Sequence, residues 1–368
     1  MAAMRPKRVV VKLGSGVLSK GRDRLDSATI RRLAREMAAC AAEGTEVIVV
    51  SSGAILAGRE RLGLKTRPAT IQLKQAAAAV GQSRLMRAWE AAFERQGRTV
   101  AQVLLTREDL RHRRRYLNAR NTIFTLLRLG AVPVINENDT VADEEIRFGD
   151  NDVLSALVAG LCDAQLLVLL TDQDGLYTAD PRSDPAAALI RSVGDGSPEP
   201  KLGRPGPAGS GGMESKVGAA KMAASAGIAA VIANGFKAGT LARVLSGEAV
   251  GTAFLPRSAP LEKRKAWLAF ASQPRGQIHV DAGAREALVR LGRSLLPSGV
   301  KEVSKGFAAG DVVSLVAEGS EFARGLTNYG SEDLKRIRGL KTSQIEQVLG
   351  GKPADEVVHR DNLALLSP

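Results

Sequence analysis

Two stretches of the sequence combine lysine with glycine, 12-KLGSG-16 and 209-GSGGMESK-216. The first closes an apolar run and the second enters a helix-forming segment. Glycine lets a backbone approach an anion closely, and the free amides at a helix N-terminus bind phosphate groups. Lys12 and Lys216 would add positive charge to such amides. Together the two stretches favour a ligand with several negative charges, such as a nucleoside triphosphate.

Each of these stretches also has a plain structural explanation. Lys12 could extend from the end of a strand into water, and the glycine run could be a flexible loop with a helix cap. Neither stretch is a Walker loop, which requires Gly-x-x-x-x-Gly-Lys, or a Gly-x-Gly-x-x-Gly fingerprint. Taken singly, each leaves both interpretations open.

The stretch 135-INENDTVADEEIRFGDND-152 carries seven carboxylates in a chain whose net charge is +13. It lacks the Asp-x-Asp-x-Asp-Gly order of a calcium loop and has no nearby histidine, so a dedicated metal site is not expected. Residues 143–145 fit a solvated loop. The side chains that flank the expected strand end and helix start fit a substrate pocket better: Asn136, Asp139, Asn151 and Asp152.

Apolar runs typical of buried strands alternate with helical segments through the first 234 residues. Such alternation predicts an α/β fold with a mostly parallel sheet sandwiched by helices. Thr171 and Asp172 would stand at the carboxyl end of a strand, where open α/β sheets bind ligands. A plain strand-to-turn signal is the alternative for 171-TDQDG-175. The expected strands are 8–13, 46–53, 99–105, 131–136, 165–172 and 228–234, and the expected helices are 27–44, 69–97 with a break near Gly81, 118–130, 151–162 and 213–227.

Composition narrows the function classes. Aromatic residues make up 4% of the chain, so a base-stacking nucleic-acid platform is not the first expectation. The two cysteines cannot form a disulfide framework or a zinc cluster, and with no signal peptide or membrane span they favour the cytoplasm. The basic run 111-RHRRR-115 fits a solvated helix face or a subunit contact better than a nucleic-acid site.

The sequence predicts two domains. Residues 1–258 carry the α/β pattern, 259–275 would be a linker, and 276–368 show short strands, Gly-containing turns and little helix after residue 295. Residues 194–212 are rich in Gly and Pro, and we interpret them as an active-site loop rather than a linker. The last 93 residues hold twelve basic and twelve acidic side chains, so the basic excess lies in the first part.

The motifs taken together carry a resemblance. KLGSG, VSSGAI at 50–55, INEND at 135–139, GDND at 149–152, LLTDQDGLYTADPR at 169–182 and GGMESK at 211–216 resemble the amino-acid kinase family in order and spacing. The β-rich tail is similar to a PUA domain. The resemblance implies an enzyme that uses ATP and Mg²⁺ to phosphorylate the side-chain carboxylate of L-glutamate to L-glutamyl 5-phosphate, the first step of proline biosynthesis. It also implies a homo-oligomer and feedback inhibition by proline.

Carried over by residue, the resemblance implies three catalytic side chains: Lys12 and Lys216 would neutralise the transferred phosphoryl group, and Asp152 would orient them. Ser52 with Gly53 would hold the reacting carboxylate of glutamate. Asp139 and Asn151 would bind its α-amino and α-carboxylate groups. The ATP-binding residues would be Lys12, Thr171, Asp172, Ser210, Gly211, Gly212, Met213, Glu214, Ser215 and Lys216.

Two other functions stay open at this stage. Another amino-acid kinase, acting on aspartate, acetylglutamate, carbamate or UMP, would share most of these motifs. An RNA-binding protein acting through the PUA-like tail is the alternative from a different class. RNA affinity depends strongly on positive charge, so the neutral tail counts against that alternative.

Overall fold

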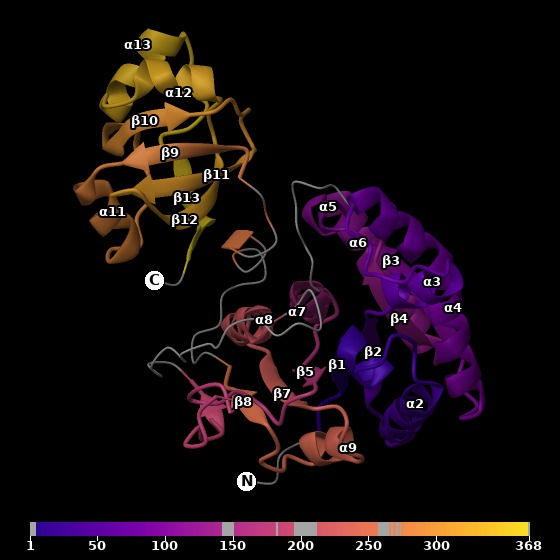
Figure 1. The fold of residues 1–368 in the computed structure, drawn as a ribbon. Helices are drawn as coiled ribbons and strands as arrows, with labels where there is room; N and C mark the ends of the chain where they lie inside the picture. Colours follow the sequence, from indigo (N-terminus) through magenta and orange to yellow (C-terminus); the bar gives the residue numbers. More distant parts are fainter. Residues whose placement is uncertain are drawn as a thin grey trace. The chain divides into compact units, whose positions relative to one another are not determined.

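The computed structural model describes residues 5–141, 151–181, 183–194, 212–256, 265, 268–269, 272 and 274–366. The chain divides into two compact units, Met1–Pro260 and Leu261–Pro368 (Figure 1). Most of the expected linker at 259–275 lies outside the described residues, so its extent stays a prediction. No helix within the described ranges is long and apolar enough to cross a membrane.

A sheet with the strand order β3-β4-β2-β1-β5-β7-β8-β6 forms the centre of the first unit. All its neighbouring strands pair in parallel except β7 and β8, which are antiparallel. Every residue of β1 is buried, as a strand covered on both faces should be. The strands are β1 Arg8–Leu13, β2 Glu46–Ser51, β3 Val100–Leu105, β4 Val132–Glu137, β5 Leu166–Thr171, β6 Ser192–Val193, β7 Ala229–Asn234 and β8 Thr252–Phe254.

Helices cover both faces of this sheet, which confirms the predicted architecture. One hydrophobic cluster joins one face to α2, α4 and α9, and a second joins the opposite face to α6, α7 and α8. Alternate residues of β1 enter different clusters, Val11 the first and Val10 the second. The helices of this unit are α1 Ser15–Ser19, α2 Ser27–Ala42, α3 Ala54–Arg61, α4 Ile71–Glu94, α5 Arg107–Arg111, α6 Arg113–Arg128, α7 Asn151–Leu161, α8 Met213–Ser225 and α9 Thr240–Leu245.

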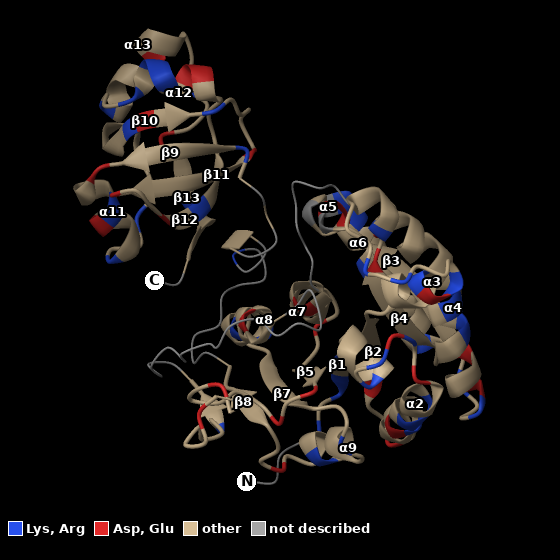
Figure 2. Ribbon diagram, viewed as in Figure 1, with Lys and Arg blue, Asp and Glu red and all other residues tan. Residues whose placement is uncertain are grey.

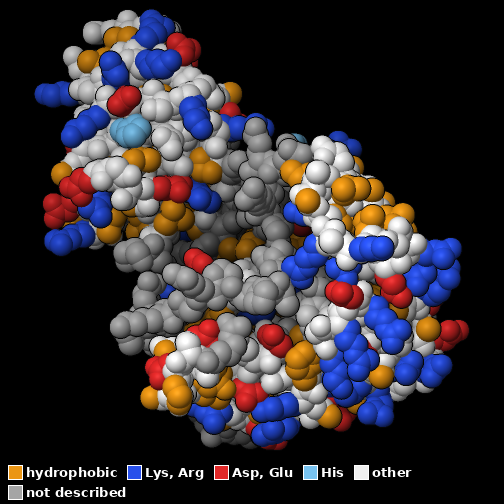
Figure 3. All heavy atoms as spheres, in the orientation of Figure 1, with side chains coloured by type: hydrophobic (Ala, Val, Ile, Leu, Met, Phe, Trp, Pro, Cys, Tyr) orange, Lys and Arg blue, Asp and Glu red, His pale blue; other side chains and the backbone are white. Residues whose placement is uncertain are grey.

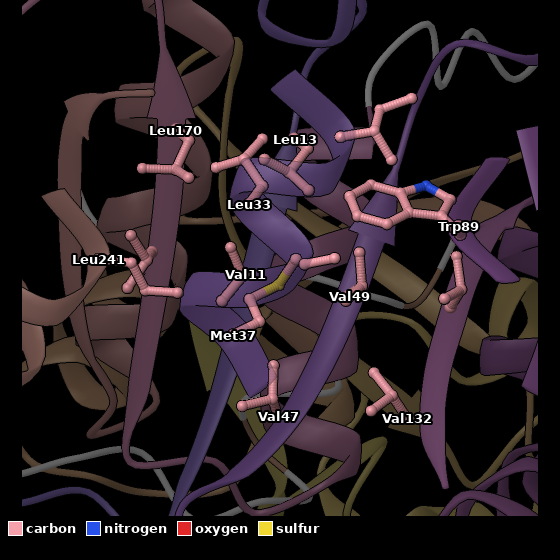
Figure 4. Packing of buried hydrophobic residues seen from close by; sticks show 14 of the residues in the cluster. Val11, Leu13, Leu33, Met37, Val47, Val49, Trp89, Val132, Leu170 and Leu241 are labelled. Atoms are coloured by element: carbon pink, nitrogen blue, oxygen red, sulfur yellow. The ribbon is translucent and has the colours of Figure 1, made fainter. Parts of the chain in front are cut away.

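The first cluster fixes the position of the long helix α4. Trp89 is fully buried beside β2 (Figure 4). Its indole Nε1 donates a hydrogen bond of 2.9 Å to Ser51 Oγ at the end of that strand. A buried indole N–H needs such a partner. The packing therefore ties α4 to the residue directly before Ser52.

The predicted break of the long helix near Gly81 is wrong, because α4 runs without interruption from Ile71 to Glu94. Gly81 has a packing role instead. A Cβ added there would lie 1.8 Å from the carbonyl oxygen of Ala54 in α3, and one added to Gly58 would lie 1.7 Å from that of Ala77. The two glycines let α3 and α4 approach backbone to backbone.

We expect Gly81→Ala to destabilise the protein. The added methyl group must push α3 away, and overpacking of this kind costs about 1–3 kcal/mol even after the better helix propensity of alanine is counted. Chemical denaturation followed by circular dichroism measures the change.

The matched control is Gly218→Ala in α8, where no neighbouring atom lies within 4 Å of the new Cβ. That variant should be unchanged or more stable by up to about 1 kcal/mol. Equal stabilities of the two variants would contradict the packing role of Gly81.

The second unit is built around a sheet of order β10-β9-β11-β12-β13. Its strands are β9 Gly276–Val280, β10 Val300–Ser304, β11 Val312–Ala317, β12 Ser320–Thr327 and β13 Val358–Leu365. The β-rich character is confirmed. Within residues 274–366, α11 Ala282–Val289 precedes residue 295. Two α-helices follow that residue, α12 Ser331–Ile337 and α13 Ile345–Leu349, so the region after residue 295 holds more helix than predicted.

Candidate active site

The candidate site begins at the carboxyl ends of the central strands. Lys12 lies in β1, the strand between β2 and β5. Its Cα is paired in register with Val50 of β2 and Leu169 of β5. Its side chain is buried, with 2% of the residue exposed. The alternative in which Lys12 extends into water is therefore wrong. A lysine buried at this depth requires a carboxylate partner.

Asp152 is that partner, and it is shared. It lies in the first turn of α7 and is fully buried. Its Oδ1 forms an ion pair with Lys12 Nζ, and its Oδ2 lies 3.2 Å from Lys216 Nζ. Ser215 Oγ donates a further hydrogen bond of 3.3 Å to the same Oδ2. One carboxylate thus brings together two lysines that are 204 positions apart in the sequence.

Lys216 reaches Asp152 because α8 begins at the right place. The helix starts at Met213, and its N-cap residue Gly212 has no side chain that could accept from the first amides. Glu214 stands in this first turn, and Lys216 is buried. The backbone amides of a helix start, next to a buried lysine, suit the binding of phosphate groups.

A chain of amide side chains borders this cluster. Asn151 Nδ2 donates to Ser52 Oγ at 2.8 Å and to Asn136 Oδ1 at 3.0 Å. Asn136 Nδ2 in turn donates to Gln82 Oε1 at 2.9 Å. The chain joins the end of β2, the end of β4, the start of α7 and the middle of α4. Asn151 directly precedes Asp152, so the amide chain and the lysine pair share one turn of helix.

In the amide chain, two atoms are buried without a hydrogen-bond partner among the described residues. They are Asn151 Oδ1 and Gln82 Nε2. Both N–H groups of the Asn151 amide are already used, which fixes its orientation and leaves the carbonyl oxygen as an acceptor. An unsatisfied buried polar atom costs about 1–3 kcal/mol. A ligand that supplies the missing partner recovers this energy on binding.

Gln82 was missed by the sequence analysis, and Asn136 was singled out there without a role. Asn136 follows a strand in a motif of polar residues, a signal that could have been followed further. Gln82 gave no such signal, because it lies within a long helix where glutamine is an ordinary surface residue. Only the close packing of α4 brings it to the end of β4.

We expect Gln82→Ala to weaken substrate binding more than turnover. Without the Gln82 carbonyl, the Asn136 amide can rotate and the orientation of Asn151 is no longer fixed, so KM should rise about three- to tenfold. Steady-state kinetics measures this. The control Gln72→Ala removes an exposed glutamine from the same helix, and a KM effect as large as that of Gln82→Ala would contradict the positioning role.

Asp139 lies two residues beyond the end of β4. Burial raises the pKa of its carboxyl from 3.8 to about 6. Among the described residues it has no ion-pair partner to offset this burial. A carboxylate held in this way attracts a cation, such as an ammonium group, because binding one would lower its pKa again.

The remaining expected nucleotide residues fall in two places. Thr171 ends β5, and its Oγ1 donates to Asp172 Oδ1 at 3.0 Å. Both therefore lie at the same carboxyl edge as Lys12. Ser210 and Gly211, like most of the loop expected at 194–212 and residues 143–145, lie outside the described residues.

Comparison with known proteins decides the family. Residues 7–234 match the model of the amino acid kinase family, and residues 276–349 match that of the PUA domain. The chain belongs to the amino acid kinase family. The β1 end, the α7 start and the β5 end described above all lie within the matched range.

Individual members of the amino acid kinase family are similar over nearly the whole chain. The chain is 54% identical to a glutamate 5-kinase from Geobacter sp. (strain M21), across 98% of both proteins. It is 52% identical to a glutamate 5-kinase from Myxococcus xanthus (strain DK1622), across 98% of this chain and 96% of the relative. A glutamate 5-kinase from Moorella thermoacetica is 50% identical, across 100% of this chain and 98% of the relative.

Proposed function

We propose that this protein is an ATP-dependent kinase that phosphorylates the side-chain carboxylate of L-glutamate to L-glutamyl 5-phosphate, the first step of proline biosynthesis. The observation that carries the proposal is the buried Asp152 carboxylate that holds Lys12 and Lys216 at the carboxyl edge of the sheet. The identity of 50–54% to glutamate 5-kinases supports glutamate as the substrate.

The two lysines address the main obstacle of the reaction. A carboxylate attacks a polyanionic nucleotide poorly, because like charges repel. Lys12 and Lys216 would sit beside the transferred phosphoryl group and neutralise charge that spreads over its oxygens. Asp152 would hold both ammonium groups in place by one rigid contact each. No general base is required, because the side chain of glutamate is already ionised near pH 7.

The amide chain and Asp139 would position the substrate. Ser52 would hold the reacting carboxylate near Lys12. Asn151 Oδ1 and the Asp139 carboxylate are both acceptors, which suits the α-ammonium group of glutamate. Holding the two reactants in line in this way supplies much of the rate enhancement in phosphoryl transfer.

Mg²⁺ fits this site as a companion of ATP. In the described part of the chain, no group of three or more His, Cys, Asp or Glu side chains is placed to hold a metal ion. Magnesium typically binds nucleotide phosphates and only one or two protein carboxylates, so it does not require such a group. We propose that the ion enters with the phosphates of ATP and neutralises part of their charge.

The test is to incubate the protein with Mg-ATP, L-glutamate and hydroxylamine and to measure glutamyl hydroxamate and ADP. An acyl phosphate reacts with hydroxylamine, so the proposal predicts equal amounts of hydroxamate and ADP with glutamate. Aspartate and N-acetylglutamate should give neither. ADP without hydroxamate would indicate a different acceptor, and the absence of both products from a folded protein would overturn the proposal.

Three further expectations from the family resemblance remain predictions. Proline would act as a feedback inhibitor, the chain would form a homo-oligomer, and the PUA domain would be dispensable for some activity. A gel-shift experiment with tRNA tests the RNA-binding alternative directly. A mobility shift that disappears with added salt would revive it.

A further inference from the structure

The first unit holds a charged cavity that the proposed reaction does not use. It has a volume of about 520 Å³, within the range typical of sites for small molecules. Its charged lining comes from the loop between α1 and α2, from α3 and from α4. The charged residues of this arginine cavity are Arg22, Arg24, Asp26, Glu60, Arg84 and Arg87.

The charges of the arginine cavity are unbalanced. Four arginines and two carboxylates give a formal sum of +2 (4 − 2). Arg22 lies 3.7 Å from Asp26, a carboxylate that also caps α2 by accepting from the Thr29 amide. Arg24, Arg84 and Arg87 form no ion pair within the described ranges. Lys and Arg side chains gather over the α3–α4 side of this unit (Figures 2 and 3).

The geometry of the cavity suits a small anion with two negative charges. Arg84 and Arg87 are three residues apart on α4 and so project from one face of the helix. Guanidinium groups bind phosphate and carboxylate oxygens through paired N–H donors. Only three of the ten lining residues are apolar, Leu25, Ala57 and Ala88, so the cavity suits a polar ligand better than a large hydrophobic one.

The cavity is linked to the candidate active site through Leu25. Leu25 lines the cavity and also packs against Gly53, which follows Ser52 directly. A Cβ added to Gly53 would lie 3.2 Å from Leu25 Cδ2. The same loop is tied to α3 by an ion pair of 2.5 Å between Asp23 and Arg59. An anion that draws the loop toward α4 would therefore press on the backbone that positions Ser52.

We propose that the arginine cavity is a regulatory site for a small phosphate-bearing dianion, and that its occupancy raises the affinity for glutamate by fixing Leu25 against Gly53. The binding part stands on the cavity alone. The coupling part rests on the proposed function, because it takes Ser52 as part of the glutamate site.

The experiment uses inorganic phosphate as the probe and isothermal titration calorimetry on the full chain. A non-hydrolysable ATP analogue with Mg²⁺ occupies the nucleotide site, and sodium chloride keeps the ionic strength constant. We expect one phosphate per chain in the wild type, and at least tenfold weaker binding in the double variant Arg84→Ala/Arg87→Ala. The charge-matched control, Lys74→Ala/Arg95→Ala, removes two exposed cations of α4 and its C-cap outside the cavity and should bind as the wild type does.

The results separate the two parts of the proposal. No saturable phosphate binding, or equal binding by the two double variants, would overturn the site. Glutamate should bind at least fivefold more tightly when phosphate is present, and phosphate more tightly by the same factor when glutamate is present, since linkage is reciprocal. Phosphate binding with an unchanged glutamate affinity would overturn the coupling. A chain that binds phosphate but no glutamate at all would instead overturn the proposed function.

Discussion

Lys216→Ala should lower the turnover number about a thousandfold while leaving the protein folded. The Lys216 ammonium would contact the phosphoryl group only as charge develops on it, so its loss acts on the transition state. A thousandfold loss corresponds to about 4 kcal/mol, which is typical for removing one preorganised charge donor. KM for glutamate should change little, because the substrate contacts lie on the amide chain. Hydroxamate formation at saturating ATP and glutamate measures the turnover.

Two controls make this prediction specific. Lys221→Ala removes another lysine from α8, beyond the first turn, and should retain nearly full turnover. Lys216→Arg keeps the positive charge but changes the donor geometry, so its turnover should lie between those of wild type and Lys216→Ala. Asp152 keeps its ion pair with Lys12 in both Lys216 variants, and thermal denaturation should confirm that they fold. A folded Lys216→Ala protein within tenfold of the wild-type turnover would remove Lys216 from the catalytic role.

The architecture could be predicted because its signals are local. Buried parallel strands are continuous apolar runs, and β1, β2, β4, β5 and β7 each appear in the structure within about two residues of the expected positions. Two departures have physical reasons. Gly81 suggested a helix break by its propensity, but close packing against α3 outweighs propensity there. The helices α12 and α13 are short, and short helices depend on tertiary packing that no local pattern reveals.

The candidate site was predictable to the extent that its residues lie at strand ends and helix starts. The three charged residues lie near the end of a strand or in the first turn of a helix: Lys12 in β1, Asp152 in α7 and Lys216 in α8. A parallel sheet brings such positions to one edge. The family resemblance implied that Asp152 orients both lysines, and the structure places it between them. Which carboxylate oxygen pairs with which lysine was beyond sequence reasoning, because it depends on how α7 and α8 pack together. The contact of Gln82 was also beyond sequence reasoning, because it depends on how α4 packs at the end of β4.

Replacing Asp139 with asparagine should raise the glutamate KM about a hundredfold. It should also abolish the fall of kcat/KM for glutamate below pH 6. In the wild type, burial raises the pKa of the Asp139 carboxyl to about 6. The carboxylate needed to pair with the α-ammonium group is therefore lost as the pH falls through 6. The wild-type kcat/KM for glutamate should fall about tenfold per pH unit below that value. Asp139→Asn should show a flat profile between pH 5 and 7 at a low level.

The same shift makes a prediction about stability with a definite sign. The carboxyl pKa is higher in the folded state than the ordinary value of 3.8, so the folded protein holds this proton more tightly than the unfolded chain does. The buried charge therefore destabilises the ligand-free protein above pH 6, by at most about 3 kcal/mol (2.2 pH units at about 1.4 kcal/mol each). That cost disappears as the pH falls from 6 toward 4.

Asp139→Asn should thus be more stable than the wild type at pH 7.5 and no more stable at pH 4, when both are measured without glutamate. Glu94→Gln, which removes an exposed carboxylate at the end of α4, should show neither the stability gain nor the altered KM profile. A gain in stability without a rise in KM would mean that Asp139 is buried for another reason and that the ammonium group binds elsewhere. A rise in KM together with the gain would show that the site keeps an unfavourable buried charge because the substrate neutralises it.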